Sequence, residues 1–157
     1  MSFSERFDSF ACEGDTITCE VDGFTFTARI VADDCPDAPD QRQDGFWPSL
    51  YKDAPGFIGP GNGFRKRFAE AQAKAEAVID AWRKGEWFYC GIVLAVERDG
   101  IALDDHAASL WGVECNYPGT DNSYLTIVAN ELLLEALDAG RAAAARHAAT
   151  VTSWATT

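Results

Sequence analysis

Residues 87–103 decide the fold; they read Trp87-Phe-Tyr-Cys-Gly-Ile-Val-Leu-Ala-Val-Glu97, then Arg98-Asp99-Gly100, then Ile101-Ala-Leu103. The first arm is the longest run of β-branched and aromatic residues in the chain, and Asp-Gly is a strong signal for a two-residue hairpin turn. Because this arm is apolar at nearly every position, we expect both of its faces to be covered. The sequence therefore predicts a central strand, over which the other elements pack.

A second hairpin is predicted nearer the start of the chain. Residues 16–21 alternate between polar and apolar, Asp22-Gly23 forms a turn, and residues 24–32 alternate again. In residues 24–32 every second side chain is apolar, namely Phe24, Phe26, Ala28 and Ile30. The side chains between them are mostly polar, namely Thr25, Thr27, Arg29 and Val31. This pattern is typical of an antiparallel sheet with one buried and one wetter face.

Two long helices complete the predicted order ββαββα, an α+β class. The first runs from about Phe64 to Lys84, with apolar residues spaced four and three apart, and stops at Gly85. The second starts near Tyr124 and ends either at Gly140 or, through an alanine-rich extension, near residue 149. We predict an antiparallel sheet of four to five strands with both helices packed on one face. Residues 1–149 form a single domain, and residues 150–157 form a frayed tail, on which Trp154 is an alternative docking or oligomer contact.

The chain is strongly acidic. Its 157 residues carry 25 Asp and Glu against 13 Lys and Arg, a net charge of −12. This charge repels nucleic acid and anionic membranes and attracts basic surfaces, including the grooves by which proteins hold nucleic acid. Neither a signal peptide nor a membrane-spanning apolar run is recognised, so we expect a cytoplasmic protein.

The five cysteines indicate no metal centre. Their number is odd and no two form Cys-x-x-Cys, which is typical of reduced, buried thiols. His106 and His147 are the only histidines and lie far in sequence from any cysteine. We therefore expect neither a zinc site nor another cofactor.

Residues 33–63 form a long loop between the first hairpin and the first helix. Proline, glycine and aspartate punctuate it too densely for long regular elements, yet it carries aromatic residues that a disordered linker lacks. We predict an ordered partner-binding segment in which carboxylates surround apolar anchors. Its candidate residues are Asp33, Asp34, Asp37, Asp40, Asp44, Trp47, Tyr51, Asp53 and Phe57, with Glu20 and Asp22 nearby.

Three other groups suggest chemistry more weakly. The loop aspartates are candidate cation ligands, but their spacing lacks the glycine and glutamate of an EF-hand. Asp104, Asp105 and His106, together with Glu114, suggest acid–base chemistry of a small metal-dependent hydrolase, although a polar bulge explains 104–108 more simply. Gly-rich residues 56–63 lack the Lys-Ser/Thr ending of a phosphate loop, and the cations of 65–67 either pair internally or hold an anion.

Residues 109–134, with the segments Glu86-Trp-Phe-Tyr-Cys-Gly-Ile-Val-Leu and Asp104-Asp-His-Ala-Ala, resemble small acidic, largely uncharacterised accessory proteins of bacteriophages and plasmids. The resemblance covers roughly residues 80–140. It implies an accessory gene of a mobile element acting in a bacterial host cell, and it supplies no catalytic residues. By analogy we expect a non-enzymatic inhibitor of host defence, of anti-CRISPR or anti-restriction type, that occupies a basic nucleic-acid-binding groove as a nucleic-acid mimic. A small metal-dependent hydrolase and an oligomeric structural protein, with homodimer formation, are the alternatives.

Overall fold

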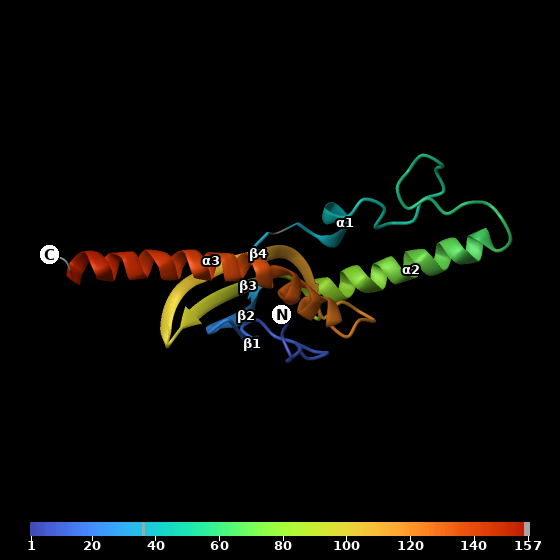
Figure 1. Cartoon of the computed structure of the whole chain (residues 1–157). Helices are drawn as coiled ribbons and strands as arrows, with labels where there is room; N and C mark the ends of the chain where they lie inside the picture. The colour runs from blue at the N-terminus through green and yellow to red at the C-terminus, as the bar shows by residue number, and fades with distance from the viewer. Residues whose placement is uncertain (36, 156–157) are drawn as a thin grey trace. The chain divides into compact units, whose positions relative to one another are not determined.

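A computed structural model of the chain gives the order β1, β2, α1, α2, β3, β4, α3 (Figure 1). It describes residues 1–35 and 37–155, and side chains within that range up to Val151. The predicted α+β class and the alternation of two hairpins with two long helices are confirmed, and the sheet has four strands in the order β1-β2-β3-β4. Among the described residues, no helix combines the length and the apolar character that crossing a membrane requires.

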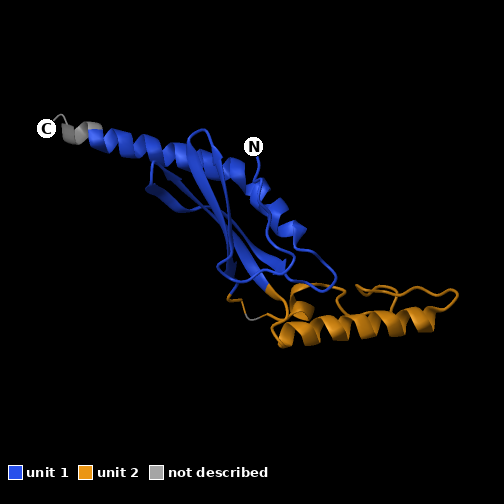
Figure 2. Cartoon of the chain, turned by 90° about the horizontal axis from the view of Figure 1, so that it is seen from below, with its two compact units in different colours: residues 1–33, 89–157 blue, residues 34–88 orange. Residues whose placement is uncertain are grey.

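The chain divides into two compact units (Figure 2). The sheet unit contains residues 1–33 and 89–157, and the second unit contains residues 34–88. We describe each unit by itself.

The sheet is antiparallel and its register follows the predicted alternation. β1 (Thr16–Val21) pairs with β2 (Phe24–Ala32), whose Phe26, Ala28 and Ile30 stand opposite Val96, Leu94 and Ile92 of β3 (Phe88–Arg98). All six of these apolar residues are buried. They form the core face, while the opposite face keeps half-buried residues such as Thr25 and Thr27, as the sequence predicts.

Helix α3 (Ser123–Ala155) covers the core face of the sheet, packing on β4 and β2. Leu125, Leu133 and Ala136 on its inner side are buried. The helix continues through Gly140 instead of ending there. A Cβ on residue 140 would lie only 2.9 Å from Val96 Cγ2. This glycine therefore allows close helix–sheet packing, and the alanine-rich sequence beyond it continues the helix through most of the segment predicted as a tail. The side chain of Trp154 lies outside the described residues.

Strand β4 (Ile101–Cys115) is longer than the sequence predicts, and it runs unbroken through residues 104–108, where we expected a bulge. The irregularity lies instead at Gly112, which has a φ of +74° and donates its N–H to Asp33 Oδ2 at 3.1 Å. Trp111, just before it, lies against Gly91 of β3: a Cβ on residue 91 would be 2.4 Å from Trp111 Cε3. The indole therefore covers the sheet where β3 has no side chain.

Residues 1–12 lie along α3 without forming a helix, although Phe3, Phe7 and Ala11 recur every four residues and are buried. Their N–H groups donate to side chains that follow one another along the chain: Phe3 to Asn130 Oδ1, Phe7 to Thr126 Oγ1 and Ala11 to Asn116 Oδ1, at 2.7, 3.1 and 2.8 Å. The side chain of Asn122, only 3% exposed, adds bonds to the Asp8 and Ser9 carbonyls. The segment is therefore held by side-chain acceptors and donors of the β4–α3 region.

The second unit contains the long loop, the short helix α1 (Pro39–Arg42) and helix α2 (Phe64–Arg83). The loop has its own hydrogen bonds, with the Ile58 N–H donating to the Ser49 carbonyl at 2.7 Å and the Arg42 guanidinium donating to the carbonyls of Asp37 and Cys35. At the other end of α2 the chain turns back, and the buried Trp87 donates its indole N–H to the Val78 carbonyl at 2.8 Å. The predicted packing of a long helix on the sheet is confirmed for α3, and α2 belongs to the second unit.

Candidate functional site

The nine candidate residues of the acidic loop fall into both units. Asp33 closes the sheet unit, where its N–H donates to the Tyr89 carbonyl at 3.0 Å and its carboxylate accepts from Gly112. The other eight lie in the second unit. Of these, Asp40 accepts a hydrogen bond from the Trp47 indole at 3.3 Å, Tyr51 is 80% exposed and Phe57 is 38% exposed. Asp34, Asp37, Asp44 and Asp53 are exposed.

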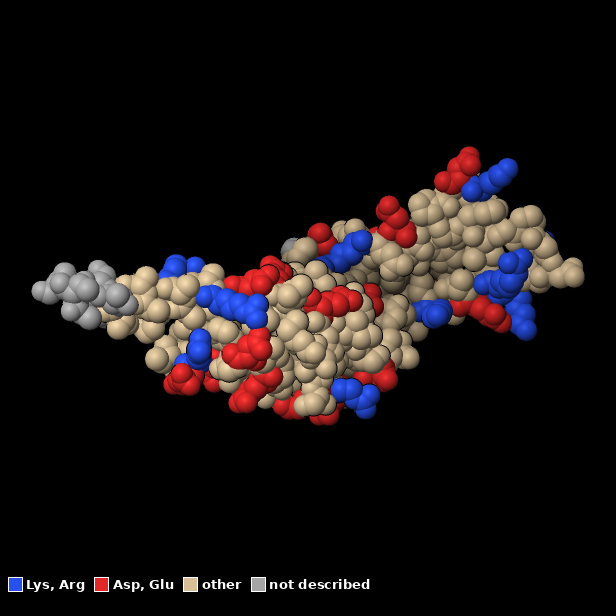
Figure 3. Space-filling view, viewed as in Figure 1, with Lys and Arg blue, Asp and Glu red and all other residues tan. Residues whose placement is uncertain are grey.

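Charge is divided unevenly between the two units. Residues 34–88 contain nine Asp and Glu against eight Lys and Arg, so the second unit is nearly neutral despite its acidic loop. Its balancing cations come largely from α2, where Lys66 lies 3.9 Å from Glu70 and Arg83 lies 3.8 Å from Asp80. The sheet unit contains the remaining 16 acidic and five basic residues, a net charge of −11. On the face drawn in Figure 3, the carboxylates of the sheet unit are spread across it rather than gathered in one patch.

Three of the five arginines of the sheet unit have contacts within it. Arg141 Nη2 lies 2.6 Å from Asp22 Oδ2, Arg29 donates to the Asp105 carbonyl, and the Arg98 guanidinium lies 5.1 Å from the centre of the Phe24 ring. These contacts leave most of the 16 carboxylates of this unit without a cation of their own unit to balance them.

The hydrolase residues do not converge. Asp104 Oδ1 accepts the N–H of His106 at 2.9 Å, which is a local turn-like bond within β4. Glu114 lies eight residues further along the same strand, about 26 Å if the strand is fully extended. Within the described part of the chain, no three His, Cys, Asp or Glu side chains are grouped so that they could hold a metal ion.

The cations at the start of α2 contact neighbouring groups of the same unit. Arg67 donates to the Gly59 carbonyl of the loop at 2.9 Å, and the Arg65 guanidinium lies 5.9 Å from the centre of the Phe64 ring. With Lys66 beside Glu70, all three have contacts inside the second unit. Arg67 therefore binds the glycine-rich part of the loop through a carbonyl, not through the aspartates.

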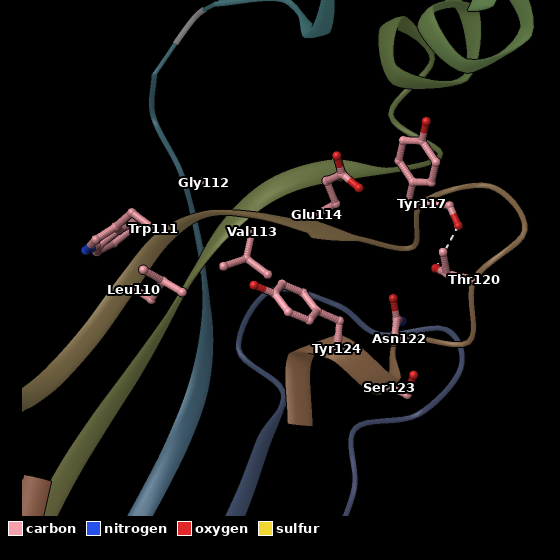
Figure 4. Close-up of a pocket in the computed structure, with 10 residues that line it drawn as sticks. All are labelled: Leu110, Trp111, Gly112, Val113, Glu114, Tyr117, Thr120, Asn122, Ser123 and Tyr124. Carbon is pink, nitrogen blue, oxygen red and sulfur yellow. Dashed lines mark hydrogen bonds between the residues drawn. The ribbon is translucent and has the colours of Figure 1, made fainter. Parts of the chain in front are cut away.

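A cavity of about 430 Å³ lies in the sheet unit where β4 turns into α3 (Figure 4). Its apolar lining comes from Leu110, Trp111, Val113 and the ring of Tyr124, and its polar lining includes Glu114, Tyr117, Thr120 and Asn122. Val113 and the Tyr124 ring lie side by side in Figure 4, while Glu114 and Tyr117 lie together beyond them. The Thr120 hydroxyl donates to the Tyr117 carbonyl at 2.9 Å and fixes the turn.

Two ionisable groups in this cavity are perturbed. Partial burial raises the pKa of Glu114 above its ordinary value. Burial, together with the nearby Glu114 carboxylate, raises the pKa of Tyr117. Both shifts mean that the cavity disfavours negative charge. A bound cation or protonation of Glu114 would therefore remove an unfavourable interaction there.

Helix α3 carries a second apolar feature, off its buried face. Tyr124, Ile127 and Leu134 are 55%, 49% and 60% exposed. The buried face of this helix is formed by Leu125, Val128, Ala129 and Leu133, so these three apolar residues lie off it. That surplus of apolar residues off the buried face was the signal available in the sequence.

Two of the five thiols, Cys90 and Cys115, are fully buried; Cys19 is half-buried, and Cys12 and Cys35 are exposed. A hydrogen bond between Cys90 and Cys115, together with burial, raises the pKa of the Cys90 thiol. The predicted burial is therefore confirmed for this pair and wrong for Cys12 and Cys35, which lie outside the strands and helices.

Comparisons with protein-family models, with curated proteins and with solved structures gave no match to this chain.

Proposed function

We propose that this protein is an acidic, non-enzymatic binding protein that engages the basic surface of a nucleic-acid-handling protein. The observation that carries the proposal is the charge of the sheet unit, where 16 carboxylates stand against five arginines. Carboxylates spread over a folded surface repel nucleic acid itself and attract the Lys- and Arg-rich grooves that bind it.

The sharpest form of the proposal is an inhibitor of a bacterial defence nuclease, of anti-CRISPR or anti-restriction type. Its support is the resemblance of residues 80–140 to small acidic proteins of phages and plasmids, together with the excess of negative charge. The mechanism is competition, in which carboxylates take the place of phosphates in the groove. Affinity then falls steeply with salt, because each carboxylate–cation contact in the encounter is screened.

Two matched variants separate the sheet unit from the acidic loop as the docking surface. One neutralises four exposed carboxylates of the sheet unit (Glu20→Gln, Glu97→Gln, Asp99→Asn and Asp105→Asn), and the other neutralises four of the loop (Asp34→Asn, Asp37→Asn, Asp44→Asn and Asp53→Asn). Both change the net charge from −12 to −8. A difference between them therefore reports position, not total charge.

The experiment captures proteins from a bacterial lysate on the immobilised chain at low salt and elutes them at high salt. Each captured protein is then tested for loss of nucleic-acid binding when this chain is added. We expect competition that weakens with salt and is weakened by the sheet-unit variant more than by the loop variant. Equal capture at low and high salt, or captured proteins whose nucleic-acid binding is unaffected, contradicts the proposal. A larger loss with the loop variant moves the docking surface to residues 34–53.

A further inference from the structure

We infer that the outer face of α3 is a docking seam for a cationic amphipathic helix of the partner. The seam consists of Tyr124, Ile127, Glu131, Leu134 and Asp138. This inference rests on the proposed function and adds to it the element of the partner that is recognised.

The spacing of the seam is the first argument. Its members lie three, four, three and four residues apart, the repeat that keeps one line of side chains facing another helix. It runs for about 21 Å, given a rise of about 1.5 Å per residue. All five residues are exposed, and the three apolar ones are 49–60% exposed. Scattered single apolar residues are ordinary on a surface, but a line of them at helix-pairing spacing is typical of a contact.

The charge of the seam selects its occupant. Between Ser123 and Gly140 the helix carries Glu131, Glu135 and Asp138 and no cation. Glu131 and Asp138 take alternate positions of the seam, so a facing helix must present Lys or Arg to them and apolar residues to Ile127 and Leu134. The first arginine, Arg141, is already bound to Asp22 at 2.6 Å, which closes the seam at that end.

A second copy of this chain fits poorly. In a parallel pair Glu131 and Asp138 would face their own copies, and in an antiparallel pair they would face Ile127 or Leu134. Either arrangement places carboxylates in a contact without a cation, between units that each carry a net charge of −11. A cationic helix removes both penalties.

The test uses synthetic probes and the full chain. The cationic probe is a capped helical peptide of three heptads with Leu and Lys at alternate seam positions; the acidic probe has Glu in place of each Lys, and a scrambled cationic probe has the same composition without the seam. Binding is followed by fluorescence anisotropy of the labelled peptides at low and intermediate salt. We expect the cationic probe to bind about tenfold or more tighter than the scrambled one.

The variants give matched comparisons. Ile127→Ala with Leu134→Ala should weaken the cationic probe about tenfold or more, whereas Ile101→Ala, at a residue also 50% exposed, should leave it unchanged. Glu131→Lys with Asp138→Lys should transfer preference to the acidic probe, which the same exchange at Glu20 and Glu97 should not do. Far-ultraviolet circular dichroism checks that each variant is folded.

Each outcome has one reading. If seam and control variants weaken the probe equally, or the scrambled probe binds as well, recognition is diffuse charge attraction; the seam is then refuted while the proposed function stands. If the chain self-associates and Leu134→Ala abolishes this, a second copy occupies the seam and the inference is wrong. If no cationic probe binds even at low salt, the seam is refuted, and the proposed function is decided by the lysate capture alone.

Discussion

The contact between Trp111 and Gly91 gives the most direct test of how the sheet is built. A Cβ on residue 91 would lie 2.4, 2.6 and 2.7 Å from three atoms of the Trp111 indole. Since Gly91 shows no positive φ, its backbone accepts alanine, and only the indole opposes the added methyl group. Gly91→Ala must therefore expel the indole from the sheet.

The cost follows from the burial of Trp111. It is 46% exposed, so a little over half of the roughly 250 Å² of a large aromatic side chain, about 130 Å², is removed from water. At about 25 cal/mol per Å² this burial contributes about 3 kcal/mol as an upper value, because the expelled ring finds other contacts. We expect Gly91→Ala to lower the free energy of unfolding by about 2–3 kcal/mol.

The assay is a double-mutant cycle measured by urea denaturation with circular dichroism. Trp111→Ala removes the obstacle, so Gly91→Ala should cost little in that background and should gain slightly, because alanine is favoured over glycine in a strand by about 0.5–1 kcal/mol. The coupling between the two substitutions, which is the difference between these effects, should therefore be about 2.5–4 kcal/mol. Equal destabilisation by Gly91→Ala in both backgrounds would refute the packing of the indole on this glycine.

Three further predictions concern other parts of the sheet unit. Asn122→Ala should lower the free energy of unfolding by about 2–4 kcal/mol and expose residues 1–12 to limited proteolysis, because it leaves buried backbone groups unpaired. Asn122→Gly removes the same hydrogen bonds but accepts the φ of +63°, so it should lower the free energy of unfolding nearly as much. Recovery of stability with glycine would show that backbone strain dominates instead. Glu114→Gln should raise the urea midpoint at pH 7 and leave it unchanged at pH 3. The pKa of Glu114 is raised in the folded state, so the stability that this side chain contributes is fully present below its unfolded pKa of about 4.3 and is lost as the pH rises through the folded pKa. An equal gain at both pH values would exclude this cause. Gly140→Ala should destabilise by about 1 kcal/mol, since crowding Val96 outweighs the better helix propensity of alanine, and should become stabilising in a Val96→Ala background; stabilisation in the wild-type background would contradict the close approach.

The sheet could be predicted because the pattern of apolar and polar residues within each strand is visible in the sequence of that strand alone. Alternation in residues 24–32 identified the core face correctly, and both Asp-Gly turns are present with Asp22 and Asp99 at φ +53°. The exceptions involve glycines whose role depends on a distant neighbour. Gly140 is one of two predicted ends of the helix, yet its place beside Val96 makes it a packing residue. Gly112, with a φ of +74°, donates its N–H to Asp33, which is 79 residues away.

The N-terminal segment shows a different limit of periodicity. Phe3, Phe7 and Ala11 recur at helical spacing, but the chain there is held by N–H bonds to Asn130, Thr126 and Asn116 instead of to its own carbonyls. Two of these acceptors lie four residues apart along α3, so the helix imposes its own period on the segment that lies against it. The same spacing in a sequence therefore indicates either a helix or an extended segment that packs along a helix.

The acidic loop illustrates why charge density along the sequence differs from charge on a surface. Residues 33–53 are dense in aspartate, and this density is why the sequence predicts a partner-binding segment there. Six of the eight cations of the second unit lie in 65–84, after the loop has ended. The sheet unit collects its 16 carboxylates from strands, turns and α3 and sets only five arginines against them. A partner attracted by the net charge of a whole unit would bind the sheet unit, whereas a partner that recognises one acidic segment would bind residues 33–53. The two four-carboxylate variants distinguish these cases.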